Sequence, residues 1–76
     1  MIDPESPIPV YRQIAAVLIE RIEASTLRPN KPIPSETALQ QEFNVSRDTA
    51  RRTVAWLRDE GWIYTVPQRG SYVAER

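Results

Sequence analysis

The sequence predicts a mostly helical α+β fold, in which three helices precede a single β-hairpin. Two serine-capped segments with helical spacing of apolar residues lie close together in mid-chain, at 35–43 and 46–60. An amphipathic segment at 9–25 precedes them, and a run rich in aromatic and β-branched residues follows at 62–74. Because the chain has 76 residues, we expect one domain with one small core.

The chain begins with a segment that has no apolar periodicity. Residues 1–7 contain two prolines, two acidic residues and a serine, which predicts a flexible, disordered or extended arm before a domain at 8–76. Pro9 suits the first turn of a helix, where its missing N–H is not needed. The first helix then buries residues at helical spacing, namely Val10, Ile14, Val17, Leu18 and Ile22, and ends near Ser25.

Three prolines exclude a helix from the next segment, residues 26–34. The residues around Ile33 either pair with a sheet edge or form a plain loop, and the sequence favours neither. Ser35 is predicted to cap the second helix, whose first turn holds Glu36. Asn44 tolerates the left-handed conformation that ends a helix, and Val45 fills the corner that follows.

Ser46 is predicted to cap the third helix, which Gly61 ends. Residues 62–66 and 71–74 read as strands, and residues 67–70 form the turn between them. Three helices followed by a hairpin make a winged helix-turn-helix, with two or three strands in the wing sheet. The core expected from these elements is apolar: Ile14, Leu18, Ile22, Leu39, Phe43, Val45, Val54, Leu57, Ile63, Tyr72 and Val73.

The composition excludes several kinds of chemistry. The sequence has no cysteine and no histidine, so it offers no disulfide, no thiolate nucleophile, no Cys/His zinc site and no histidine base. We therefore expect no metal, no cofactor and no enzymatic activity. No apolar run approaches the roughly 20 residues that span a bilayer, and no signal peptide is visible. These features predict a cytoplasmic location without a membrane partner.

The net charge is zero, but the charged side chains are unevenly distributed along the chain. Residues 1–46 contain four basic and six acidic side chains, whereas residues 47–69 contain five basic and three acidic ones. The positive charge therefore lies on the third helix and the hairpin. Arginine there can contact guanine or clamp a phosphate, and the first residues of this helix are the ones that meet bases in helix-turn-helix proteins.

The sequence accordingly predicts binding to double-stranded DNA, with the third helix in the major groove and the hairpin tip in the minor groove. Gly70 lets the backbone beside Arg69 approach a narrow groove closely. The candidate contacts are all polar, charged or small: Ser35, Ser46, Arg47, Asp48, Thr49, Arg51, Arg52, Arg69 and Gly70. Taken singly, each has an ordinary alternative as a helix cap, a solvated helix face or a plain turn.

A different reading is a winged helix that binds another protein and no specific DNA. It is favoured by the zero net charge and by two aromatic residues, Trp56 and Trp62, that are expected to be exposed. Trp56 either covers the first helix or belongs to an interface between subunits, and the sequence does not decide between them.

With these residues laid out, the chain resembles the DNA-binding domain of the GntR family of bacterial transcription regulators, from about Pro9 to Val73. The resemblance implies a winged helix that binds operator DNA as a two-fold dimer, with palindromic half-sites, usually as a repressor. The motifs that carry it are Val10-Tyr11-Arg12-Gln13-Ile14, Ile33-Pro34-Ser35-Glu36 with Leu39, Val45-Ser46-Arg47 with Thr49 and Arg51, Leu57 with Glu60-Gly61, and Gln68-Arg69-Gly70-Ser71-Tyr72-Val73.

The resemblance places the base and phosphate contacts on Arg47, Thr49 and Arg51, with support from the two capping serines, and the minor-groove contact on Arg69. Thr37 stands where many members carry a DNA-contacting arginine, so that contact is expected to be weakened or lost. Asp48 is repelled by phosphate and is expected to accept from a cytosine amino group instead.

Other departures from the family pattern replace glycines by Asn30 and Asn44, and a larger aliphatic residue by Ala50. Family regulators also carry a C-terminal effector domain that senses a metabolite and forms the dimer, and this chain has no counterpart of it. The chain is therefore expected to be either an excised DNA-binding domain or a naturally minimal regulator.

Overall fold

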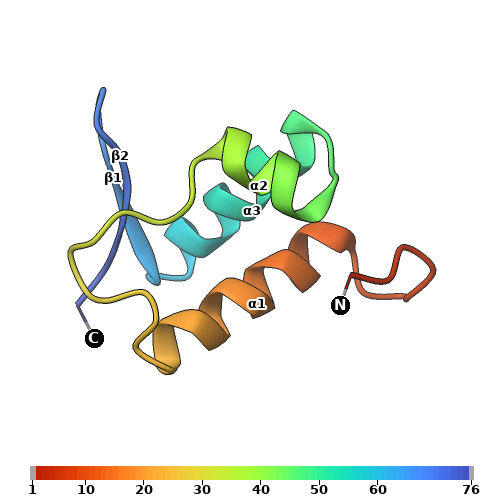
Figure 1. The fold of residues 1–76 in the computed structure, drawn as a ribbon, viewed down its shortest axis with the longest axis horizontal. Coiled ribbons are helices and arrows are strands. Elements are labelled where there is room, and N and C mark those ends of the chain that lie inside the picture. The colour runs from red at the N-terminus through yellow and green to blue at the C-terminus, as the bar shows by residue number, and fades with distance from the viewer. Residues whose placement is uncertain (1, 76) are drawn as a thin grey trace.

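A computed structural model describes residues 2–75. The elements in chain order are α1 (Val10–Glu23), α2 (Glu36–Phe43), α3 (Arg47–Asp59), β1 (Ile63–Val66) and β2 (Gly70–Val73). The helix α1 runs along one side of the molecule, α2 and α3 pack above it, and the hairpin stands at the end where α1 finishes (Figure 1). The predicted winged helix-turn-helix class is confirmed.

The helix α1 begins after Pro9, whose extended backbone (φ −57°, ψ 146°) sets the entry of the chain. It ends at Glu23, two residues before the predicted boundary, and Ser25 then has a positive φ of 63° that no regular helix allows.

The segment before α1, residues 1–7, was predicted to be a flexible, disordered or extended arm, and its described part, residues 2–7, contains a turn that lies against α1. The Gln13 amide accepts from the backbone N–H of Asp3 at 2.7 Å, and it donates to the carbonyls of Asp3 and Ile8, both at 2.8 Å. Ile2 packs against the core. The Gln13 hydrogen bonds and the packing of Ile2 together hold this segment against α1.

The caps at the two central helices form as predicted. Ser35 Oγ accepts from the N–H of Ala38 at 3.1 Å, and Ser46 Oγ accepts from the N–H of Thr49 at 3.2 Å. Between these helices, Asn44 takes the left-handed conformation with φ 54° and ψ 54°. These local signals fix where α2 and α3 begin and how the chain turns between them.

The core lies where α1, α2 and α3 meet the base of the hairpin. Most of the predicted core residues are buried, but Ile22, Phe43, Val45 and Tyr72 are only partly so. Thr53 is fully buried, and its hydroxyl donates to the Thr49 carbonyl at 2.9 Å. The buried apolar residues are Ile14, Ala15, Leu18, Ile33, Leu39, Ala50, Val54, Leu57, Ile63 and Val73.

The wing is an antiparallel hairpin in which Ile63 pairs with Val73 and Thr65 with Ser71. The segment around Ile33, whose state the sequence left open, pairs with the other edge of β2. The N–H of Asn30 donates to the Val73 carbonyl at 2.7 Å, and the N–H of Ile33 donates to the Ser71 carbonyl at 3.0 Å. The wing sheet thus has two strands plus this short bridged segment.

Candidate nucleic-acid interface

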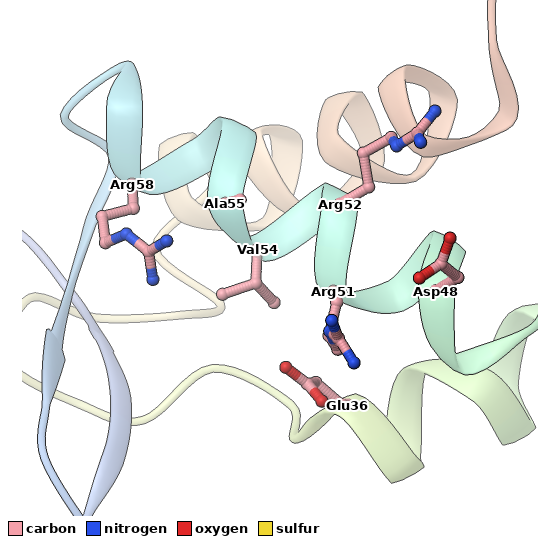
Figure 2. Close-up of a pocket in the computed structure, with 7 residues that line it drawn as sticks. All are labelled: Glu36, Asp48, Arg51, Arg52, Val54, Ala55 and Arg58. Atoms are coloured by element: carbon pink, nitrogen blue, oxygen red, sulfur yellow. The ribbon is translucent and has the colours of Figure 1, made fainter.

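A shallow concave surface lies along α3, between the start of α2 and the wing (Figure 2). It is open to solvent, and its volume is about 440 Å³. Three of the lining side chains are arginines and two are acidic, so the surface carries a local positive charge. The lining residues are Glu36, Asp48, Arg51, Arg52, Val54, Ala55 and Arg58.

Arg51 extends from α3 toward Glu36 at the start of α2 (Figure 2). Beside it, Arg47 Nε lies 3.9 Å from Glu36 Oε1, and the Arg47 side chain is 74% exposed. An ion pair this exposed is weak, so the guanidinium can exchange the carboxylate for another anion. Two arginines of α3, Arg47 and Arg51, thus lie near Glu36 at the start of α2.

The hydroxyl groups at the start of α3 are engaged with each other. Ser46 Oγ accepts from the N–H of Thr49 and also donates to Thr49 Oγ1 at 3.1 Å. Ser46 is therefore first of all a helix cap, and the same holds for Ser35 at α2. The Thr49 hydroxyl, which accepts from Ser46, keeps its own hydrogen for a further acceptor.

Arg52 points away from Arg51 and toward α1 (Figure 2). Its guanidinium carbon lies 5.6 Å from the centroid of the Tyr11 ring, a cation–π arrangement. Asp48 lies between the two arginines, because it lines both the concave surface and a second recess that adjoins Tyr11. The structure thus separates the predicted contacts of α3 into two flanks of one helix.

Arg69 and Gly70 lie at the tip of the wing and do not line the surface along α3. The tip is a tight turn in which the N–H of Arg69 donates to the Val66 carbonyl at 3.0 Å. Gln68 has a φ of 65° and Gly70 a φ of 115°, a value that few residues other than glycine adopt. The turn holds the Arg69 side chain exposed to solvent.

Sequence reasoning did not include Arg58 among the candidate contacts, although it lines the concave surface. Its Nη1 donates to Thr65 Oγ1 at 3.1 Å, and Thr65 Oγ1 lies 3.0 Å from Ser71 Oγ on the paired strand. Helical spacing alone places Arg58 on the same flank as Arg47 and Arg51, so the signal was present. The part played by Thr65 and Ser71 depends on how the hairpin meets α3, which no local pattern encodes.

The two tryptophans are half-buried and pack against the core. The Arg12 guanidinium lies over the Trp56 ring at 4.3 Å from its centroid, so Trp56 covers α1, one of the two roles that the sequence left open. The alternative of a protein-interaction module therefore loses one of its two supports, the exposed tryptophans, and keeps the zero net charge.

Away from this surface, the Arg21 guanidinium on α1 donates to the Glu42 carboxylate on α2. This hydrogen bond lowers the pKa of Glu42 and raises the pKa of Arg21. Across residues 2–75, no three His, Cys, Asp or Glu side chains gather closely enough to hold a metal ion. None of the helices in that range combines the length and the apolar character needed to cross a bilayer.

Comparison with known proteins places this geometry in a family context. A family model described as "Bacterial regulatory proteins, gntR family" matches residues 10–73. The repressor NagR of Bacillus subtilis is 38% identical over 97% of this chain, and the mannosyl-D-glycerate system repressor MngR of Escherichia coli is 40% identical over 88% of it. The chain spans only 30% and 28% of the length of these two relatives.

Two solved structures show how similar the fold is. The DNA-binding domain of AraR, solved in complex with the operator ORR3, superposes with a TM-score of 0.85 at 32% identity, covering 97% of this chain and 89% of that one. YtrA from Sulfolobus acidocaldarius, described as a GntR-family transcription factor, gives 0.83 at 37% identity and covers 100% of this chain and 64% of its own.

Proposed function

The chain belongs to the gntR family of bacterial regulatory proteins, and on that premise we propose that it binds a specific double-stranded operator as part of a transcription regulator. The observation that carries the proposal is the concave surface where the arginines of α3 lie between the start of α2 and the wing. The AraR domain, which is similar over nearly the whole chain, was solved on an operator, and this supports the same partner for the present chain.

In the proposed complex, the first half of α3 enters the major groove, whose width of about 12 Å admits a helix. Arg47 and Arg51 contact guanine edges or phosphates there, and the Thr49 hydroxyl donates to an adjacent acceptor. Asp48 accepts from a cytosine amino group, because the same carboxylate is repelled by phosphate. The free N–H groups at the starts of α2 and α3, beside Ser35 and Ser46, face the phosphate backbone.

The flanking elements extend this footprint. Arg52, on the α1 side of α3, lies near the sugar-phosphate backbone of the neighbouring DNA strand. Arg69 enters the adjacent minor groove from the wing tip, where the backbone at Gly70 can approach the duplex closely. A narrow minor groove has an enhanced negative potential, which attracts an inserted arginine.

We further propose that the whole regulator acts in the cytoplasm as a repressor, with two copies on palindromic half-sites. NagR and MngR are both named repressors, and they are similar to this chain over most of its length. Two-fold symmetry of the protein would then be mirrored in the operator, with half-site centres about 34 Å apart or a multiple of that distance.

The experiment that tests the proposal begins with selection of bound sequences from random duplexes, followed by titration of the selected site with Arg51→Ala. We expect affinity to fall by a factor of about 5 to 150, the range for one base-contacting arginine, with relaxed preference at one position. A contact to phosphate alone would instead weaken binding to all sequences alike and reduce the salt dependence.

Arg28→Ala is the matched control, since it removes the same charge from an exposed loop beyond the end of α1. Its affinity for the selected site should equal that of the wild type. Unchanged affinity in Arg51→Ala, or failure to select any sequence, contradicts the proposed docking.

A further inference from the structure

One side chain connects α3 to both strands of the wing. Arg58 Nη1 donates to Thr65 Oγ1 on β1 at 3.1 Å, and Thr65 Oγ1 lies 3.0 Å from Ser71 Oγ on β2. Thr65 and Ser71 are direct cross-strand partners, so this single guanidinium reaches the hairpin as a unit. Figure 2 shows the Arg58 side chain leaving α3 on the side where the hairpin stands.

This contact lies farther out along the wing than the residues that the core holds. Ile63 and Val73 anchor the base of the hairpin, with 3% and 0% of their surfaces exposed. Thr65 and Ser71 follow two residues farther out on that same face, because side chains alternate along a strand. Beyond them the tip is exposed, and an isolated two-stranded hairpin is only marginally stable.

The bridged segment around Ile33 does not replace this contact. It pairs with the edge of β2 and therefore restrains the hairpin in the plane of its own sheet. The Arg58 contact acts across the face of the sheet toward α3, which is the direction in which the hairpin would tilt.

The geometry of the hairpin magnifies any looseness at this contact. At a rise of about 3.3 Å per residue, Thr65 lies roughly 7 Å from the anchored Ile63, and Val66, the last residue of β1, lies roughly 10 Å from it. A displacement at Thr65 therefore becomes about 1.5 times larger at Val66, and the turn lies beyond that residue. A wing tip that must reach one groove while α3 lies in another tolerates little such displacement.

We infer that Arg58 is a positioning residue, which sets the tilt of the wing relative to α3 through Thr65 and Ser71. Its effect on DNA binding rests on the proposed function, because the tilt decides whether Arg69 reaches the minor groove while Arg51 is in the major groove. The restraint on the tilt is a property of the free chain, and the mobility of the wing tip measures it without DNA.

The rival role for an exposed arginine beside a DNA-binding surface is direct contact with a phosphate. Thr65→Val separates the two roles, because it removes the acceptor while it keeps the β-branched shape and leaves the Arg58 charge intact. Thr26→Val, at an exposed position in the loop after α1, is the matched control. Thermal unfolding confirms that each variant is folded at the temperature used.

The first measurement is the heteronuclear 15N NOE of the free protein. In Thr65→Val and in Arg58→Ala, we expect lower values at the amides of residues 68–70 than in the wild type, with unchanged values across α3. Thr26→Val should leave both regions as they are. Equal values at the wing tip in the wild type and in both wing variants overturn the inference.

The second measurement is a double-mutant cycle on the selected duplex. Thr65→Val should weaken binding about three- to tenfold, the range for one lost hydrogen bond, and should have no further effect in an Arg69→Ala or an Arg58→Ala background. Full affinity in Thr65→Val alongside weak binding in Arg58→Ala overturns the inference in favour of phosphate contact. Effects of Thr65→Val and Arg69→Ala that multiply overturn it as well.

The two measurements keep the proposals apart. A wild-type chain that binds no duplex even at low salt contradicts the proposed function, and the NOE comparison still decides whether Arg58 restrains the wing.

Discussion

Ser46 combines a structural role with a position at the proposed DNA surface. Its Oγ accepts from the N–H of Thr49 and donates to the Thr49 hydroxyl, so it orders the start of α3. It also lies next to Arg47, whose guanidinium is free to leave Glu36 for a phosphate. Substitutions at this residue can separate stability from binding.

We expect Ser46→Ala to lower the free energy of unfolding by about 1 kcal/mol, measured by urea titration, because the first turn of α3 loses its cap. Ser46→Asp should keep the stability, since a carboxylate accepts the same N–H and suits the helix dipole. It should nevertheless bind the duplex more weakly, because it places a negative charge beside phosphate.

Ser46→Asn is the control for that comparison, since it caps the helix without a charge. Wild-type stability in Ser46→Ala would show that the cap contributes nothing. Wild-type affinity in Ser46→Asp would show that the start of α3 does not lie beside the DNA backbone.

Among the elements, the turn between α2 and α3 sets how the two helices face one side of the molecule. Asn44 is in the left-handed region, and the following N–H, that of Val45, donates to the Gln40 carbonyl at 3.2 Å. Most residues with a Cβ are strained in this conformation, and asparagine is tolerated there.

We therefore expect Asn44→Ala to lower the free energy of unfolding by about 1 kcal/mol, and Asn44→Gly to stay within about 0.5 kcal/mol of the wild type. Chemical denaturation measures both. Gln41→Ala, at an exposed position inside α2, should change little. Equal losses in Asn44→Ala and Asn44→Gly would mean that the side chain, rather than the backbone conformation, matters at this turn.

The helices could be predicted because their signals are local. Ser35, Ser46 and Asn44 each act within four residues of their own position, so the sequence shows them directly. Ile33 gave no such signal, because its pairing partner Ser71 lies far along the chain and the flanking prolines suit either a loop or an edge segment.

In the candidate site, too, local features could be predicted and contacts between distant segments could not. The helical spacing of Arg47, Arg51 and Arg58 follows from the sequence, whereas the turn of Arg52 toward Tyr11 follows from the packing of α1 against α3. The bond from Arg58 to Thr65 needs the angle between a helix and a hairpin, which only tertiary packing sets.

For the molecule as a whole, charge couples stability to pH weakly. The sequence has no histidine, so we expect stability to be flat between about pH 5.5 and 7. The pair of Arg21 and Glu42 joins α1 to α2 on a partly exposed surface, with 30% and 41% of the two side chains accessible.

The Arg21 hydrogen bond holds the pKa of Glu42 below its ordinary value of 4.5. The stabilisation is therefore fully present above pH 4.5 and is lost as the pH falls through the lower pKa of the folded state. We expect Glu42→Gln to be less stable than the wild type at neutral pH by at most about 1 kcal/mol, because solvent screens the pair.

Urea titrations at several pH values test this, and the two curves should converge in acid. Glu23→Gln, at an exposed site without an ion pair among residues 2–75, serves as the control. A difference between Glu42→Gln and the wild type that persists unchanged well below pH 4 would refute the assignment.

The bridged segment around Ile33 also bears on the order in which the protein is assembled. Asn30 and Ile33 find their backbone partners, Val73 and Ser71, roughly 40 residues later, after both central helices have been made. During folding, the helices can dock on one another while this segment still has only water as a partner. Pairing of this segment with β2 then closes a loop that contains the docked helices. The entropy cost of closing that loop changes only slowly with its length.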